Sequence, residues 1–212
     1  MNPKSIVYNC DCVEYMRTLA DNHFDLAIAD PPYGINISSN PFRRRLEPKE
    51  WDNIELGNDF FTELFRVSKN QIIWGGNYFN LPPTKCFLVW DKRQPFDFSS
   101  AMCEYAWCSF NSPAKLFRYK VTLEKNKIHV CQKPVSLYAW ILQNYANNGD
   151  KIFDPMIGSG SSRIAAYKMG FDYVGCELDK DYFDAQNERF ASLCLGETRT
   201  SDNRTIKQLS IF

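Results

Sequence analysis

Strand-like and helix-like segments alternate along this chain, and this alternation constrains the fold most strongly. Residues 24–30 (FDLAIAD) form a continuous apolar run, which is typical of a strand buried on both faces of a sheet. Residues 13–20 and 161–170 instead carry apolar side chains at helical spacing. Such alternation predicts an α/β fold, a mostly parallel sheet with helices on both faces. We expect strands at 5–10, 24–30, 71–76, 85–92, 103–110, 151–155 and 172–179, and helices at 13–20, 59–69, 135–149, 161–170 and 181–195.

Composition narrows the class of protein. The 212 residues suit one domain with a sizeable core. The formal net charge of zero leaves nucleic-acid binding open, because a basic face can be balanced by acids elsewhere. Eight cysteines are scattered without a CxxC pair and there are two histidines, so we expect no metal. There is no signal peptide and no apolar run near the roughly 18 residues of a membrane span, so we expect a cytoplasmic protein with reduced thiols and no membrane partner.

A glycine-rich loop follows the strand expected at 151–155. In DPMIGSGSS, Gly158 and Gly160 permit a tight turn and close approach to a ligand, and the next helix begins with unpaired N–H groups. Glu177 ends the following strand about 20 residues later, the spacing at which an acid meets a ribose hydroxyl. Asp154 would repel a pyrophosphate and attract an ammonium group, which favours S-adenosylmethionine over a dinucleotide. The alternative is a turn that merely joins a strand to a helix.

The apolar strand at 24–30 ends in an unusual turn, DPPYG. Pro31 and Pro32 fix their φ angles and have no N–H to donate, so the turn offers carbonyl oxygens and the Asp30 carboxylate as acceptors. Tyr33 adds a flat face for stacking. These features suit the exocyclic amine of adenine or cytosine in a base flipped out of the duplex, with no covalent nucleophile. The alternative is a buried strand that ends in a Pro-Pro turn capped by Asp30.

The segments DPPYG, DPMIGSGSS and HVCQKP together resemble motifs of the amino-methylating DNA methyltransferases, which modify adenine N6 or cytosine N4. The last two are similar to DPFxGSGT and HPTQKP in that family. The catalytic motif precedes the cofactor loop, which is the circularly permuted order of the β class. WGGNYF, LVWDKR and CEYAW further resemble small members carried by phages or prophages. The resemblance implies a Rossmann-like class I methyltransferase sheet of seven strands, the last one reversed.

The resemblance spans about residues 5–195 and implies one domain, 1–195. Its catalytic half would be 1–127 and its cofactor-loop half 128–195. The polar segment that follows, 196–212, is expected to be a flexible tail.

The resemblance also implies the residues of the site. The catalytic pocket would comprise Asp30, Pro31, Pro32 and Tyr33. S-adenosyl-L-methionine, converted to S-adenosyl-L-homocysteine, would contact Asp11, Cys12, Asp30, Lys133, Asp154, Pro155, Met156, Gly158, Gly160, Ser161, Glu177 and Leu178. Among these, Asp11 would approach the adenine end, Glu177 the ribose and Lys133 the carboxylate. Two departures from the family motifs, Val130-Cys131 for Pro-Thr and Met156 for Phe, keep apolar or small character.

Double-stranded DNA is the expected partner of a monomer or homodimer. DNA-contacting loops are expected at about 36–53 and 112–127, where basic residues suit phosphates and interleaved aromatics suit unstacked bases. The candidate DNA-binding residues are Arg43, Arg44, Arg45, Asn77, Tyr78, Arg93, Lys115, Arg118 and Lys120. The alternative is that the charge runs are solvated loops.

The chain ends in QLSIF, which resembles the QLSLF or QLDLF peptide that bacterial proteins insert into the sliding clamp. Gln208, Leu209, Ile211 and Phe212 would bind the clamp. The alternatives are a tail that folds back on the core and a chance match.

Rival functions remain beside the leading one. We expect adenine N6 ahead of cytosine N4, because DPPY is commoner among adenine enzymes and SPPY marks many cytosine enzymes. Relatives that methylate RNA or a protein glutamine more often carry NPPY. A non-catalytic DNA-binding or clamp-associated protein that kept the fold is the alternative of another class, against which the intact Asp30, Tyr33, Asp154 and Glu177 count.

Overall fold

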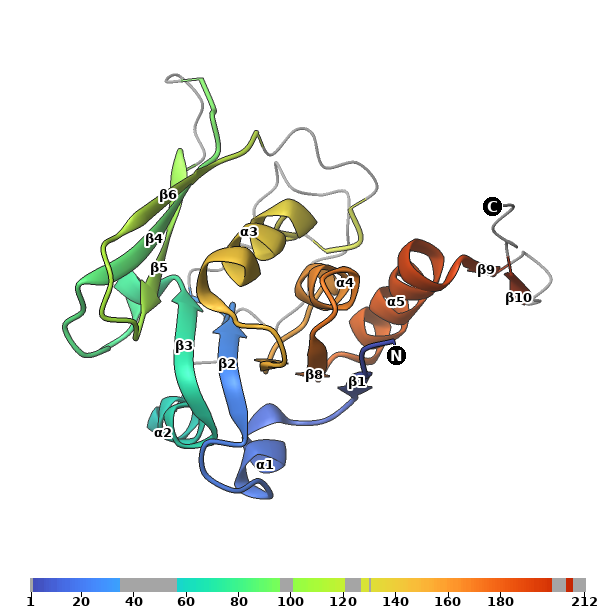
Figure 1. Cartoon of the computed structure of the whole chain (residues 1–212), viewed down its shortest axis with the longest axis horizontal. Coiled ribbons are helices and arrows are strands. Elements are labelled where there is room, and N and C mark those ends of the chain that lie inside the picture. Colours follow the sequence, from blue (N-terminus) through green and yellow to red (C-terminus); the bar gives the residue numbers. More distant parts are fainter. Residues whose placement is uncertain are drawn as a thin grey trace.

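The computed structural model describes residues 2–34, 57–95, 101–120, 127–129, 131–199 and 205–207. Its centre is a sheet of eight strands in the order β1-β8-β7-β2-β3-β5-β4-β6 (Figure 1). These strands are β1 (Ser5–Tyr8), β2 (Phe24–Ala29), β3 (Ser68–Trp74), β4 (Cys86–Asp91), β5 (Cys103–Cys108), β6 (Lys115–Arg118), β7 (Lys151–Asp154) and β8 (Asp172–Cys176). The helices are α1 (Cys12–Arg17), α2 (Asn58–Val67), α3 (Val135–Tyr145), α4 (Ser161–Lys168) and α5 (Lys180–Phe190), with a 3₁₀ turn η4 (Gly76–Tyr78) and a π-helical turn η6 (Ala191–Leu195). Among the helices of these described ranges, none has the length and apolar character needed to cross a membrane.

The sheet is mostly parallel, which confirms the expected α/β class. Within the described sheet the reversed strand is β5, which lies between β3 and β4 and is antiparallel to both. The sheet has one strand more than the seven expected, because β6 pairs with β4 at the edge. Residues 115–118 lie in a basic segment without clear apolar periodicity, so the sequence did not predict this strand.

Side chains of β2 alternate between two cores, as a strand covered on both faces requires. Leu26 and Ile28 pack in a core that includes side chains of α3 and α4. Ala27 and Ala29 pack in a second core with side chains of α1 and α2. The helices therefore cover both faces of the sheet (Figure 1).

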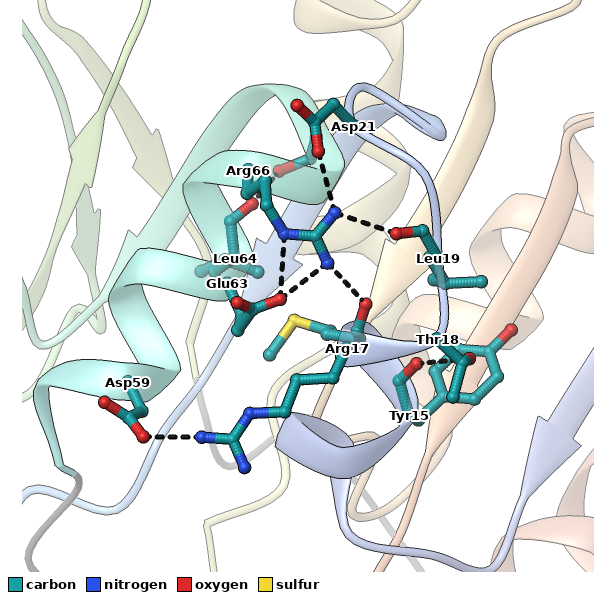
Figure 2. A network of polar contacts seen from close by, with 11 residues as sticks. Tyr15, Arg17, Thr18, Leu19, Asp21, Asp59, Glu63, Leu64 and Arg66 are labelled. Atoms are coloured by element: carbon teal, nitrogen blue, oxygen red, sulfur yellow. Dashed lines mark hydrogen bonds and ion pairs between the residues drawn. The ribbon is translucent and has the colours of Figure 1, made fainter.

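Arg66, on α2, closes the end of α1 (Figure 2). The last carbonyl groups of a helix have no partner within the helix. Arg66 donates to the carbonyl oxygens of Met16 and Leu19, each at 2.8 Å. It also forms ion pairs with Asp21 at 2.8 Å and Glu63 at 2.6 Å. These contacts join α1 to α2 just before β2 and β3 begin.

Residues 197–199 and 205–207 form two short strands, where the sequence predicts a flexible tail. Strands β9 (Glu197–Arg199) and β10 (Thr205–Lys207) form a separate antiparallel pair there. Ile206 lies opposite Thr198 in their register. The proposed clamp-binding residues lie outside the described residues, namely Gln208, Leu209, Ile211 and Phe212.

Candidate active site

Asp30, Asp154 and Glu177 lie at neighbouring strand ends. Asp154 is the last residue of β7, Asp30 follows β2, and Glu177 follows β8. The three strands are parallel and adjacent, so their carboxyl ends share one edge of the sheet. Ligands bind at this edge in open α/β folds. The structure thus brings together two motifs that are far apart in the sequence.

Both oxygens of the Asp30 carboxylate have partners within the chain. The Tyr33 hydroxyl donates to Oδ1 at 2.9 Å, and the Lys133 ammonium forms an ion pair with Oδ2. Burial raises the pKa of Asp30, and Lys133 opposes that rise. Burial and the neighbouring Asp30 also raise the pKa of Tyr33 well above its usual value, so its hydroxyl remains a donor.

Tyr33 lies in an aromatic stack beside a glycine. The ring of Tyr78 stacks on it, with centroids 4.9 Å apart and planes 14° from parallel. Gly75 has a φ of +67°, and a Cβ there would lie 2.1 Å from Tyr33 Cε1, so only glycine permits this approach. Tyr78 is 50% exposed, and Asn77 beside it on η4 is exposed as well. The WGGNYF segment therefore places the exposed Tyr78 next to Tyr33, whose hydroxyl is hydrogen-bonded to Asp30.

A chain of largely buried ion pairs ends at Asp30. Lys133 Nζ lies 3.2 Å from Glu104 Oε2, an ion pair without hydrogen-bond geometry, and Lys92 Nζ lies 2.6 Å from Glu104 Oε1. Burial would raise the pKa of Glu104, but the two lysines outweigh burial and lower it to about 2. Burial would lower the pKa of Lys133, but Asp30 and Glu104 raise it instead. Glu104 and Lys133 therefore stay charged at neutral pH.

Asp154 shapes the glycine loop from within. Its Oδ1 accepts the backbone N–H of Met156 at 3.0 Å, and its Oδ2 accepts the Ser162 hydroxyl at 2.5 Å. Burial raises the pKa of Asp154 to about 7 against these hydrogen bonds. The carboxylate thus holds both ends of the loop. Pro155 is buried in the loop as well.

Glu177 fixes the same loop from the neighbouring strand. Its Oε2 accepts the backbone N–H of Gly158 at 2.9 Å, and its Oε1 accepts that of Asp179 at 2.9 Å. Gly158 and Gly160 have φ angles of +51° and +73°, where side chains are rare. Gly160 precedes Ser161, the buried first residue of α4, so the loop leads directly into a helix. Leu178, next to Glu177, is 62% exposed.

Asp11 lies at the end of the neighbouring edge strand. Its carboxylate caps α1 by accepting the backbone N–H groups of Val13 at 2.7 Å and Glu14 at 3.0 Å. An open depression beside it is lined in part by Tyr8 and Tyr15. Cys12 is buried, and burial raises the pKa of its thiol to about 12, which makes it a poor nucleophile.

Known proteins resemble this chain in sequence. Residues 87–188 match the N6 and N4 family described as DNA methylase. The type II methyltransferase M.HinfI of Haemophilus influenzae is 24% identical, covering 86% of this chain and 67% of its own. These matches confirm the resemblance to the N6/N4 DNA methyltransferases. The range matched by the family includes Glu104, Lys133, Asp154 and Glu177, and it begins after Asp30.

Solved structures share the methyltransferase fold. A DNA modification methylase of Thermus thermophilus, TTHA0409, solved in complex with S-adenosyl-L-methionine, has a TM-score of 0.59 and 16% identity, covering 91% of this chain and 95% of its own. PvuII DNA methyltransferase, which is cytosine-N4-specific, has a TM-score of 0.67 and 12% identity, covering 89% of this chain and 87% of its own. At these identities the likeness establishes the fold alone and leaves the activity and the target base open.

The predicted basic DNA-binding residues fall into two groups. Arg43, Arg44 and Arg45 lie outside the described residues. Arg93, Lys115, Arg118 and Lys120 are exposed. Arg118 Nε lies 3.4 Å from Asp91 Oδ2, and the backbone N–H of Arg93 donates to Asp91 Oδ1 at 2.8 Å. Because Asp91 ends β4, these two arginines lie on the same edge of the sheet as Asp30.

Sequence reasoning missed Lys92 and Glu104. Lys92 directly follows β4, so a charge at the end of an apolar strand was the available signal. Glu104 gave no such signal, because it lies near the start of β5, and only the reversal of β5 brings that start to the carboxyl edge. Lys133 was expected beside the cofactor carboxylate, whereas the structure directs its ammonium to Asp30 and Glu104.

Proposed function

We propose that this chain uses S-adenosyl-L-methionine to methylate the exocyclic amine of a flipped DNA base, adenine N6 ahead of cytosine N4. The observation that carries the proposal is the Asp30–Tyr33 pair at the carboxyl end of β2, beside the glycine loop that follows β7. The non-catalytic alternative is disfavoured, because the chain keeps all three acidic residues expected at such a site, Asp30, Asp154 and Glu177.

The residues present fit S-adenosyl-L-methionine, which would supply an electrophilic methyl group on sulfonium. The Gly158 backbone leaves room that a side chain would occupy, with a Cβ there 3.6 Å from the His129 ring. The buried Gln132 Nε2 has no hydrogen-bond partner among the described residues. Its segment packs on this loop through His129, so the amide suits the cofactor carboxylate. Glu177 oxygens retain lone pairs for ribose hydroxyls.

The remaining cofactor contacts are assigned by position. Asp11 and Leu178 would lie at the adenine end, beside the depression next to α1. Asp154 would act through the shape of the loop, since both its oxygens hold loop donors. Lys133 would act on Asp30 more directly than on the cofactor.

Asp30 and Tyr33 would prepare the target amine. The Asp30 carboxylate and the Pro31 carbonyl accept the two amino hydrogens, which turns the nitrogen lone pair out of the ring plane. Tyr33 offers the ring on which the base stacks. The nitrogen would give up one proton as the methyl group leaves the sulfonium, and Asp30, whose pKa burial raises, would be placed to accept it.

Cytosine N4 is the second candidate, because the PvuII enzyme of that specificity shares the fold at a TM-score of 0.67. For DNA, we propose phosphate contacts by the basic residues on the β4 and β6 ends and by Arg43, Arg44 and Arg45. We also propose clamp binding by the terminal QLSIF; deletion of residues 208–212 would abolish recovery with a sliding clamp.

Transfer of a labelled methyl group from S-adenosyl-L-methionine to unmethylated DNA tests the proposal. We expect transfer by the wild type and a loss of about 10³-fold or more in Asp30→Ala. Nucleoside analysis of the product then separates N6-methyladenine from N4-methylcytosine. Absence of transfer to any DNA by the wild type would overturn the proposal and favour the non-catalytic alternative.

A further inference from the structure

The position of the Lys133 ammonium is fixed by three neighbours. A lysine chain is flexible, so its charge takes a defined place only where the surroundings hold it. Asp30 Oδ2 and Glu104 Oε2 both pair with Nζ, and the centroid of the Trp74 ring lies 5.2 Å from it. Trp74 is fully buried, so the aromatic neighbour cannot move aside.

Glu104 is held in turn by Lys92. Lys92 Nζ lies 2.6 Å from Glu104 Oε1 and 5.4 Å from the centroid of the Trp90 ring. Trp90 lies opposite Glu104 in the register of β4 and β5. The two oxygens of Glu104 therefore face one lysine each. A carboxylate that is largely removed from water requires such pairing with cations. Here the pairing also links the ends of β4 and β5 to Lys133, which is ion-paired with Asp30.

We propose that Glu104 is a positioning residue for the methyl transfer assigned above, on which this inference rests. Through Lys133 it fixes the orientation of the Asp30 carboxylate toward the target amine, without touching the reacting atoms. By sharing the charge of Lys133, it also keeps Asp30 a stronger acceptor than a closed ion pair would be.

A purely structural role for Glu104 makes a different prediction. Under that role Glu104 only balances two buried lysines, and Glu104→Gln alone would leave an excess positive charge that can unfold the protein. The double variant Lys92→Met/Glu104→Gln removes one charge of each sign and leaves Lys133 paired with Asp30. If charge balance were the whole role, the double variant would restore activity together with stability.

The test compares wild type, Glu104→Gln and the double variant in labelled methyl transfer to unmethylated DNA across pH, with melting temperature and calorimetric S-adenosyl-L-methionine affinity. We expect the double variant to melt within a few degrees of the wild type and to bind the cofactor equally well. Its kcat should fall by about 10-fold or more with little change in KM. Its acid limb should move to lower pH, because loss of the Glu104 charge lowers the pKa of Asp30.

Three results would overturn the inference. Wild-type kcat and pH profile in the double variant would show that Glu104 only balances charge. A parallel loss of cofactor affinity and turnover would show a general collapse of the site. An inactive wild type would instead overturn the proposed function, and this inference with it; the wild-type control separates that failure from the first two.

Discussion

The two ends of β2 carry polar networks of opposite character. At the amino end, Arg66 pairs with Asp21, and their side chains are 28% and 72% exposed. At the carboxyl end, Lys133 pairs with Asp30, and their side chains are 3% and 20% exposed. Water reaches the side chains of Arg66 and Asp21 at the first site, whereas it hardly reaches Lys133 at the second. Similar ion pairs therefore fasten helices at one end of the strand and orient a carboxylate at the other.

Removing the cation from each network is the strongest test of this difference between the two ends of β2. Lys133→Met leaves Asp30 without its ion-pair partner and Glu104 with Lys92 alone, and we expect the free energy of unfolding to fall by about 3–5 kcal/mol. Arg66→Met should cost less, because Asp21 is 72% exposed and can be hydrated, so that Glu63 alone remains largely buried. Urea unfolding of both variants measures the difference.

The pH dependence of that loss has a defined sign. Without Lys133, the pKa of Asp30 rises further above its usual value. A carboxyl group whose pKa is raised by folding destabilises the folded state as pH rises. The loss of stability in Lys133→Met should therefore grow from about pH 4 upward. Equal, pH-independent losses in both variants would contradict the distinction between the two ends.

The sequence predicted the parts of the fold that have local signals. Residues 24–30 and 151–155 showed the apolar runs of buried strands, and most helices showed apolar periodicity. The same signals failed at β6, where side chains of Lys115–Arg118 are mostly exposed and no apolar face repeats. The pairing of β9 with β10 was missed for a similar reason, because polar strands stabilised by pairing lack hydrophobic alternation.

The site was predictable only where residues belong to a motif. Asp30 and Asp154 stand in recognisable turns at strand ends, so their placement at one edge followed from the parallel sheet. Glu104 depends on a strand reversal that no local pattern shows. Lys133 contacts Asp30 because of the way the segment before α3 packs in the fold. The spacing of residues in the sequence does not reveal such tertiary packing.

A second pair of variants compares one carboxylate at the amino edge of the sheet with one at the carboxyl edge. Burial would raise the pKa of Asp25, but hydrogen bonds from the Lys151 backbone N–H and from Lys69 lower it, whereas burial raises the pKa of Asp154 to about 7. Asp25 thus adds stability that is lost as pH falls through its lowered pKa. Asp154 subtracts stability as pH rises from about 4 to 7.

Urea unfolding between about pH 3 and 8 measures both effects. Asp154→Asn should become more stable relative to the wild type as pH rises, since it removes the cost of ionising a buried group. Asp25→Asn should become less stable relative to the wild type over the same rise. Parallel curves for the two variants would show that the two ends do not differ in this respect.

The smallest expected effect concerns DNA and compares two exposed ion pairs. Arg118 pairs with Asp91 at the carboxyl edge and Lys69 with Asp25 at the amino edge, with side chains 67% and 56% exposed. Arg118→Gln and Lys69→Gln each remove one positive charge. If Arg118 contacts a phosphate, its loss should reduce the slope of log affinity against log salt by about one, for any DNA sequence. Lys69→Gln should leave the slope unchanged, because its edge faces away from the site; equal slopes in both variants would mean that overall charge, and not the carboxyl edge, attracts the DNA.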